Sequence, residues 1–176
     1  MKKFTTITLA LVLALGLFSN VQAQEEGESV AGLGIGFASY LGGNSNLPPI
    51  SLSYDYGYND KISIGGYLGY SSASEDLGFV GTWNYTYIIV AARGLYHFEI
   101  IDNIDTYGGL LLGYNIASSE IEGGNNGFLT PATPTVGGVL YGAFIGGRYA
   151  LTDQFGVFLE LGYGIAAVNV GVNFKF

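Results

Sequence analysis

The final residues of the chain, 168–176, alternate strictly between apolar side chains and small or polar ones. The positions in between hold Asn, Gly or Lys, and the apolar series is Val168, Val170, Val172, Phe174 and Phe176. Successive side chains of a β-strand point to opposite faces of its sheet, so this alternation predicts a strand with one apolar face. The pattern recurs along most of the chain, and the alternate positions that form the apolar face carry almost no charge. A soluble protein with half-buried strands would not require this pattern along its whole length.

The composition agrees with a chain that crosses a membrane by strands. Mean hydropathy is +0.36 and only 11% of the residues are charged, whereas a soluble domain carries about a quarter. Beyond the N-terminus, no segment holds the roughly 18 consecutive apolar residues of a membrane helix. A β-barrel needs only half of each strand to be apolar, so it satisfies both observations.

The N-terminus has the pattern of a secretory signal. A basic start, Met1–Lys3, precedes an apolar run, Ile7–Phe18, and then small residues at Val21 and Ala23. The run is too short to span a bilayer comfortably, so a cleaved signal is favoured over a retained anchor. The predicted organisation is a signal peptide over residues 1–23, a short acidic periplasmic N-terminus over 24–30 and a transmembrane barrel domain over 31–176.

Charge and cysteine usage exclude several classes of function. Removal of Lys2 and Lys3 leaves four basic residues against fourteen acidic ones, a formal net charge of −10. Nucleic acid is therefore not an expected partner, because binding it requires a basic surface. The chain has no cysteine, so neither a disulfide framework nor a thiolate metal site can form.

Eight alternating segments follow one another, separated by turn-forming residues. Short turns are expected near Asn59–Asp60, Asp102–Asn103 and Thr152–Gln154, and long connections over 72–84 and 117–135. The eight strands are predicted to have about 9–11 residues each, the length that a tilted strand needs to cross a bilayer. Short periplasmic turns with longer outer loops are typical of outer-membrane barrels. The predicted fold is all-β: an eight-stranded antiparallel up-and-down transmembrane β-barrel.

A short Leu-Gly-Tyr string ends three of the upward strands. Its tyrosines are Tyr70, Tyr114 and Tyr163. At a membrane interface a tyrosine ring can be buried while its hydroxyl stays hydrated. We therefore predict that these three residues form an outer aromatic girdle.

The chain resembles the OmpA/OmpX-like family of eight-stranded outer-membrane barrels, of the outer membrane protein β-barrel domain or porin-family type common in Bacteroidota. The resemblance is carried by Ala92–Phe98, Asp105–Asn115, Gly146–Asp153, Leu159–Gly164 and 168–176. It implies residence in the outer membrane of a Gram-negative bacterium, reached by export through the periplasm. It also implies the barrel-assembly machinery as a partner during biogenesis, with Phe174 and Phe176 as the C-terminal assembly signal.

Few charged residues fall on the inward parity. Arg93, Arg148 and Glu160 are predicted to form an interior salt-bridge network, with Asp55 and Lys175 also facing inward. Buried charges persist only when they are paired and hydrogen-bonded. An eight-stranded barrel is just wide enough to be filled by its side chains. A network that fills the lumen is therefore favoured over a gate that rearranges to open a narrow water path.

No catalytic, cofactor or metal site is predicted. His97 is the single histidine and is expected at the periplasmic end of the fourth strand, facing inward. The outer-membrane acylases and deacylases of similar architecture use a histidine near the outer leaflet, so a packed role is expected instead. Neither a metal-ligand spacing nor a phosphate-binding glycine loop accompanies it.

The expected function is a structural or surface-interaction role without catalysis. The outer connections 72–84 and 117–135 are the expected docking places for a protein or surface ligand, because barrels of this kind carry function in their loops. Outer-membrane lipid is the other expected partner. The alternatives are a small gated or low-conductance porin, an accessory subunit of a larger outer-membrane complex and, last, a lipid-modifying enzyme.

Overall fold

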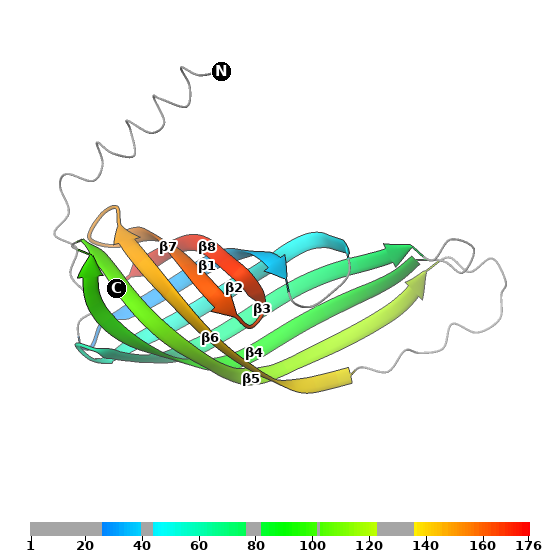
Figure 1. The fold of residues 1–176 in the computed structure, drawn as a ribbon, viewed down its shortest axis with the longest axis horizontal. Helices are drawn as coiled ribbons and strands as arrows, with labels where there is room; N and C mark the ends of the chain where they lie inside the picture. Colours follow the sequence, from blue (N-terminus) through cyan, green and yellow to red (C-terminus); the bar gives the residue numbers. More distant parts are fainter. Residues whose placement is uncertain (1–25, 40–43, 77–81, 102, 123–135) are drawn as a thin grey trace, which may run out of the picture.

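The chain folds into a closed barrel of eight strands in sequence order, each antiparallel to its neighbours (Figure 1). The computed structural model describes residues 26–39, 44–76, 82–101, 103–122 and 136–176. The predicted fold class is thereby confirmed. The strands are β1 (Ser29–Ser39), β2 (Asn44–Asn59), β3 (Ile62–Asp76), β4 (Thr82–Ile101), β5 (Ile104–Glu122), β6 (Val136–Ala150), β7 (Phe155–Tyr163) and β8 (Ala166–Lys175). No helix in these ranges is long and apolar enough to cross a membrane.

The alternation of side chains divides the barrel wall into an apolar outside and a more polar inside. On β8, Val172 exposes 38% of its surface and the next residue, Asn173, exposes 9%. On β4, Val90 is half exposed while Arg93 is buried. The apolar parity read from the sequence is thus the outer surface, which is the surface that lipid covers in a membrane barrel.

The predicted strand length of about 9–11 residues is wrong for five strands. The five strands β2–β6 have between 15 and 20 residues, whereas β1, β7 and β8 have 11, 9 and 10. Residues 72–84, expected as a loop, mostly continue the β3–β4 ladder, in which Ser72 pairs with Thr86 and Asp76 with Thr82. Ladder hydrogen bonds join main-chain groups, so pairing continues past the point where the apolar alternation ends.

The other expected connections are also shorter than predicted. β5 extends to Glu122, inside the connection predicted over 117–135, and β2 begins at Asn44. β1 begins at Ser29, before the expected start at residue 31, and its first residue exchanges main-chain hydrogen bonds with Phe176. Residues 77–81 and 123–135, which make up the rest of the two predicted docking loops, lie outside the described residues.

The unequal strands give the barrel two kinds of wall. We call β2–β6 the tall wall and β7, β8 and β1 the short wall. Figure 1 shows β3, β4 and β5 continuing well past the end of the β7–β8 hairpin. Only residues 164 and 165 connect β7 to β8. Beyond that turn, no strand among the described residues faces the inside of the tall wall.

Glycines on the inner face let large side chains fill the lumen. The ring of Phe158 lies on Gly34 and Gly171, where an added Cβ would come within 2.9 Å and 2.7 Å of the ring. Phe158 is only 8% exposed. Packing inside this narrow barrel therefore requires the absence of a side chain at those two positions.

Candidate functional site

The deepest part of the lumen is built around Asp55, a β2 side chain with no exposed surface. Arg93 places its Nε 3.0 Å from one carboxylate oxygen of Asp55, and Arg148 donates a hydrogen bond to the other. The two arginines come from β4 and β6, and both are buried. One carboxylate thus compensates two guanidinium groups that come from two other strands.

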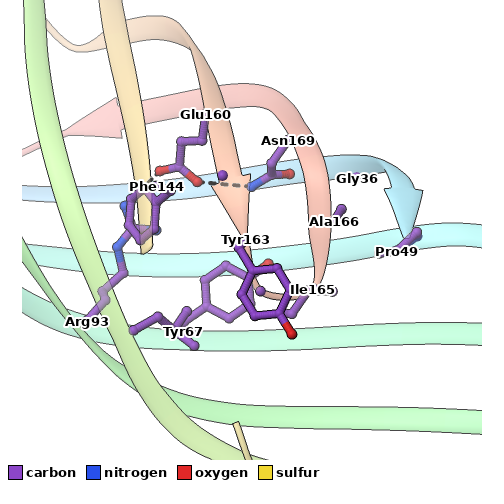
Figure 2. A pocket seen from close by; sticks show the side chains of 13 residues that line it. Gly36, Pro49, Tyr67, Arg93, Phe144, Glu160, Tyr163, Ile165, Ala166 and Asn169 are labelled. Carbon is purple, nitrogen blue, oxygen red and sulfur yellow. Dashed lines mark hydrogen bonds and ion pairs between the residues drawn. The ribbon is translucent and has the colours of Figure 1, made fainter. Parts of the chain in front are cut away.

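Glu160 on β7 is the second carboxylate that contacts Arg93. Its Oε1 accepts hydrogen bonds from Arg93 Nη2 at 2.7 Å and from the Tyr107 hydroxyl at 2.9 Å. Its Oε2 accepts a bond from Asn169 Nδ2 at 3.2 Å, which Figure 2 shows as a dashed line. Both oxygens of the buried carboxylate are therefore satisfied, as burial of a charge demands.

Aromatic rings complete the surroundings of both arginines. The guanidinium of Arg93 lies 4.9 Å from the ring centre of Phe144, and that of Arg148 lies 4.8 Å from that of Tyr107. At these distances the ring faces attract the cations, and the attraction is stronger in a desolvated site. The lumen thus stabilises its positive charges by rings as well as by carboxylates.

His97 links Asp105, which lies beside Arg148, to a serine near the short turns of the barrel. Its Nδ1 is 2.7 Å from Asp105 Oδ1 and its Nε2 is 2.8 Å from Ser63 Oγ. Asp105 Oδ2 in turn lies 3.9 Å from Arg148 Nη1. The imidazole Nδ1–H can donate to the Asp105 carboxylate, and Nε2 shares a hydrogen bond with the Ser63 hydroxyl.

These three residues have the connectivity of a serine hydrolase triad. Ser63 has no exposed surface and His97 exposes only 3%. A nucleophile must be within reach of a substrate carbonyl, and the Ser63 hydroxyl is enclosed by the wall and the lumen side chains. In this conformation the trio can orient the network, and the Ser63 hydroxyl is closed off from solvent.

The three predicted network residues lie in one connected cluster. Glu160 pairs with Arg93, while Arg148 pairs with Asp55. Lys175 lies apart, 2.6 Å from Glu28 at the end of the barrel. We call Asp55, Arg93, Asp105, Arg148 and Glu160 the charged cluster.

Sequence reasoning missed two polar members of this region, Asp105 and Ser63. Both fall on the inward parity of their strands, Asp105 two residues before Tyr107 and Ser63 two residues before Gly65. That parity is the signal that could have found them. Both residues also lie close to strand ends, where the sequence pattern does not separate the strand from its turn.

An apolar layer covers the charged cluster on the side of the long connections. Its buried members come from β3, β4, β5 and the β7–β8 connection: Tyr67, Ile89, Ala91, Leu111 and Ile165. Leu140 and Phe144 pack against them. Ile89 lies four residues before Arg93 on β4, so the layer and the cluster are stacked along the barrel axis. We call the five buried residues the apolar layer.

A small cavity lies between the two layers. Its volume is about 40 Å³, and its lining includes Arg93, Glu160, Tyr67, Asn169 and Ile165. Figure 2 shows Glu160 and Asn169 on one side of it, with Tyr67 and Ile165 on the other. Such a volume holds at most about three waters. The space beside the Arg93–Glu160 contact is thus no larger than a few water molecules.

The other predicted site residues lie on the outer surface. The girdle tyrosines Tyr70, Tyr114 and Tyr163 are 43%, 49% and 56% exposed. Phe174 and Phe176 are 44% and 60% exposed, with ring centres 5.7 Å apart. Within the described ranges, no group of three or more His, Asp or Glu side chains is arranged to hold a metal ion.

Solved structures with the same fold are small outer-membrane barrels. Neisserial surface protein A aligns with a TM-score of 0.58 and 17% identity, covering 85% of this chain and 95% of its own. The outer membrane protein OprG of Pseudomonas aeruginosa gives 0.57 and 11%, covering 89% and 99%. The attachment invasion locus protein Ail of Yersinia pestis gives 0.51 and 18%, covering 86% and 99%. At these identities the likeness establishes the fold alone.

Sequence comparison identifies the family. No curated protein matches the chain. The family model of the outer membrane protein beta-barrel domain matches residues 8–176, nearly the whole sequence. The closed eight-stranded barrel agrees with that match. The chain therefore belongs to the outer membrane protein beta-barrel domain family.

Proposed function

We propose that this protein is a non-catalytic outer-membrane barrel whose tall wall and outer loops bind a partner at the cell surface. The observation that carries the proposal is the contrast between a filled lumen and a wall that rises far beyond the membrane. The cavity between the charged cluster and the apolar layer has a volume of about 40 Å³. Transport through the barrel would require both layers to move.

The tall wall is longer than membrane crossing requires. β4 has 20 residues, which at about 3.3 Å per residue and a tilt of about 45° rise about 47 Å along the membrane normal. The apolar band of an outer-membrane barrel is about 25 Å tall. The surplus length of β4 and of its neighbours supports a structure that stands outside the hydrocarbon and is available to a partner.

The charge of the chain bears on the ligand. One solved structure of Ail is a complex with the heparin analogue sucrose octasulfate, a polyanion. The present chain, by contrast, carries a formal net charge of −10 after loss of Lys2 and Lys3. A polyanion would be repelled by such a surface, so we expect a neutral or basic protein partner instead.

The test removes the end of one outer hairpin. Ala73 and Tyr85 are ladder partners, so residues 74–84 can be replaced by an Asn-Gly turn that joins them. Cells are cross-linked with formaldehyde, and the protein and its partners are quantified by mass spectrometry. We expect a partner recovered with the wild type to fall at least tenfold in the variant, while heat-modifiable gel migration shows that both fold. Equal recovery would contradict the proposal.

A small gated porin is the second candidate, and the cavity beside Glu160 favours it. If the contact between Arg93 and Glu160 opens, the cavity could extend into a narrow water path. Single-channel recording in planar bilayers separates the two functions. We expect no conductance steps from the wild type, and reproducible steps would favour the porin. The accessory-subunit alternative predicts a stoichiometric complex in the same cross-linking experiment.

We expect no hydrolase activity from Ser63, His97 and Asp105. A fluorophosphonate probe, which labels activated serines, tests this on the folded protein. Labelling that disappears in Ser63→Ala would overturn the expectation and revive the lipid-modifying enzyme. Unlabelled protein is the outcome expected from a serine with no exposed surface.

Export and assembly are part of the proposal. The predicted signal peptide would be removed on passage to the periplasm, and Phe174 and Phe176 would be read by the barrel-assembly machinery. Deletion of Phe176 is expected to reduce assembly in cells more than refolding in detergent. Equal effects in both settings would indicate that the residue acts through stability alone.

A further inference from the structure

The tall wall has two free edges beyond the short wall. On one side the β1–β2 ladder ends at the pair Ile35–Ile50, so β2 residues 44–49 have no β1 partner. On the other side the β6–β7 ladder begins only at the pair Ala143–Tyr163. β6 residues before Ala143 pair with β5 but with no strand of the described chain on their other side.

The β2 edge is blocked by its own sequence. Pro48 and Pro49 fall where the β1–β2 ladder stops, and proline has no main-chain N–H to donate. Two register shifts against β3 occur on the same stretch, between Ser45 and Leu47 and between Leu47 and Ile50. Prolines and bulges are the devices by which natural sheets prevent a further strand from pairing.

The β6 edge has none of these devices. Residues 137–141 read Gly-Gly-Val-Leu-Tyr, with no proline and no charge. Their register against β5 is continuous, from Ile116–Gly137 to Leu112–Tyr141. Val139 and Tyr141 are 72% and 68% exposed, and Figure 1 shows the start of β6, in yellow, extending beyond the β7–β8 hairpin. Alternate residues of such an edge present both N–H and C=O outward.

We propose that the edge of β6 at residues 137–141 binds an extended segment of a partner protein, which adds a strand to the tall wall. Main-chain hydrogen bonds would supply the affinity, and the uncharged edge selects a segment with alternating apolar side chains. The added strand would continue the line of β7 above its last residue, Tyr163, over about five residues or 17 Å. This inference rests on the proposed surface-binding function and adds the edge of β6 to the surface that binds.

A second copy of the chain in the same membrane does not fit this edge. Two such barrels would be related by a twofold axis along the membrane normal. Their β6 strands would both descend toward the periplasm and, with a tilt of about 35–45°, would cross at about 70–90°. Strands pair only when they are nearly parallel or antiparallel. The segment that completes the edge must therefore come from a differently oriented chain.

The chain offers its own probe for the test. Residues 112–117 of β5 pair with residues 136–141 along one edge of β6. A fluorescent hexapeptide with the sequence of residues 112–117 can therefore pair with the other, open edge of β6. Binding to the full chain in nanodiscs is measured by fluorescence polarisation. We expect saturable binding, and at least a tenfold loss when alternate peptide nitrogens along the donating edge are methylated.

Two variants locate the peptide. Gly138 has open space around an added Cβ, so Gly138→Lys places a charge on the edge without a clash and should weaken binding at least fivefold. Leu47→Lys, on the blocked β2 edge where Leu47 is 48% exposed, is the matched control and should bind as the wild type does. Heat-modifiable migration confirms that each variant is folded.

Three outcomes would overturn the proposal. The first is absence of saturable binding, and the second is equal binding by the methylated peptide or by Gly138→Lys. The third is binding that occurs only after residues 123–135 are replaced by a short Gly-Ser linker, which would assign the edge to that segment of the chain. A peptide that fails while loss of residues 74–84 still removes the partner would reject the β6 edge but leave the surface-binding function standing.

Discussion

The charged cluster and the apolar layer fill neighbouring levels of the same barrel by different means. In the charged cluster each group depends on named partners, such as Arg93 between Asp55 and Glu160. In the apolar layer, Ile89 and Leu111 are buried by shape and volume alone. The comparison teaches that the lumen of a narrow barrel can be filled by directional polar contacts or by apolar packing. This barrel uses one kind at each of two neighbouring levels.

The two levels should differ in how they respond to mutation. Loss of one charge leaves its partners buried and uncompensated. Movement of the neighbouring side chains does not remove this electrostatic cost. Loss of an apolar side chain leaves a cavity whose cost depends on how far the neighbours move in. We therefore expect the largest single effect in the charged cluster and a smaller one in the apolar layer.

Asp55→Ala should be the most damaging single change. It leaves Arg93 and Arg148 without the carboxylate that both contact, at an expected cost of about 3–5 kcal/mol in unfolding free energy. The measurement is the urea midpoint of detergent-refolded protein followed by tryptophan fluorescence. Asp60→Ala, at an exposed turn position, is the control and should change stability by less than about 0.5 kcal/mol. Similar midpoints for the two variants would show that Asp55 does not hold the cluster.

Ile89→Ala tests the apolar layer. Ile89 is 1% exposed, and its truncation should cost about 2–5 kcal/mol through lost contacts and a residual cavity. Ile88, the preceding residue, is 45% exposed on the outer surface, where lipid or detergent refills the space. Ile88→Ala should therefore cost clearly less in the same urea titration. An equal cost would mean that the layer is not tightly packed.

Both levels depend on the assigned parity, which a pair of arginine substitutions on β8 checks. Val172→Arg puts a charge on the lipid face near mid-strand and should cost about 2–4 kcal/mol, whereas Asn173→Arg on the inner face should cost less. The two sites share one strand, so β-propensity is controlled. Heat-modifiable migration and urea midpoints give the readout. If Val172→Arg folds as well as Asn173→Arg, the inner and outer faces must be reassigned.

The sequence predicted the charged level better than the apolar one. Arg93, Arg148 and Glu160 stand out because charges are rare on the inward parity, and each lies in the cluster. Their pairing could not be read, because it depends on the stagger between strands far apart in the chain, such as β2 and β6. Ile89 and Leu111 were missed because the rule of apolar outside and small or polar inside assigns no role to a large apolar residue facing inward.

The same limits apply to the fold. Strand number, order and parity followed from alternation, since side-chain period and turn chemistry are local properties. Strand ends did not, because the ladder continues through Ser72, Ala73 and Ser74 by main-chain pairing, without an apolar face. The unequal edges of the tall wall depend on where each neighbouring strand stops, so they could be seen only in the folded barrel.

The smallest predicted effect is also the most specific to the charged cluster. Arg93→Gln, Glu160→Gln and their combination form a double-mutant cycle on a direct contact of 2.7 Å, for which we expect a coupling of about 0.5–3 kcal/mol. Arg148→Gln combined with Glu160→Gln forms the matched cycle on two members whose close ion pairs are with different partners, and its coupling should be smaller. Both are measured from urea midpoints under one condition. The double change at Arg93 and Glu160 should recover part of the loss, because neither charge is then left without its partner. Equal coupling energies in the two cycles would mean that all charges of the cluster interact to a similar extent, and that the direct contacts add little.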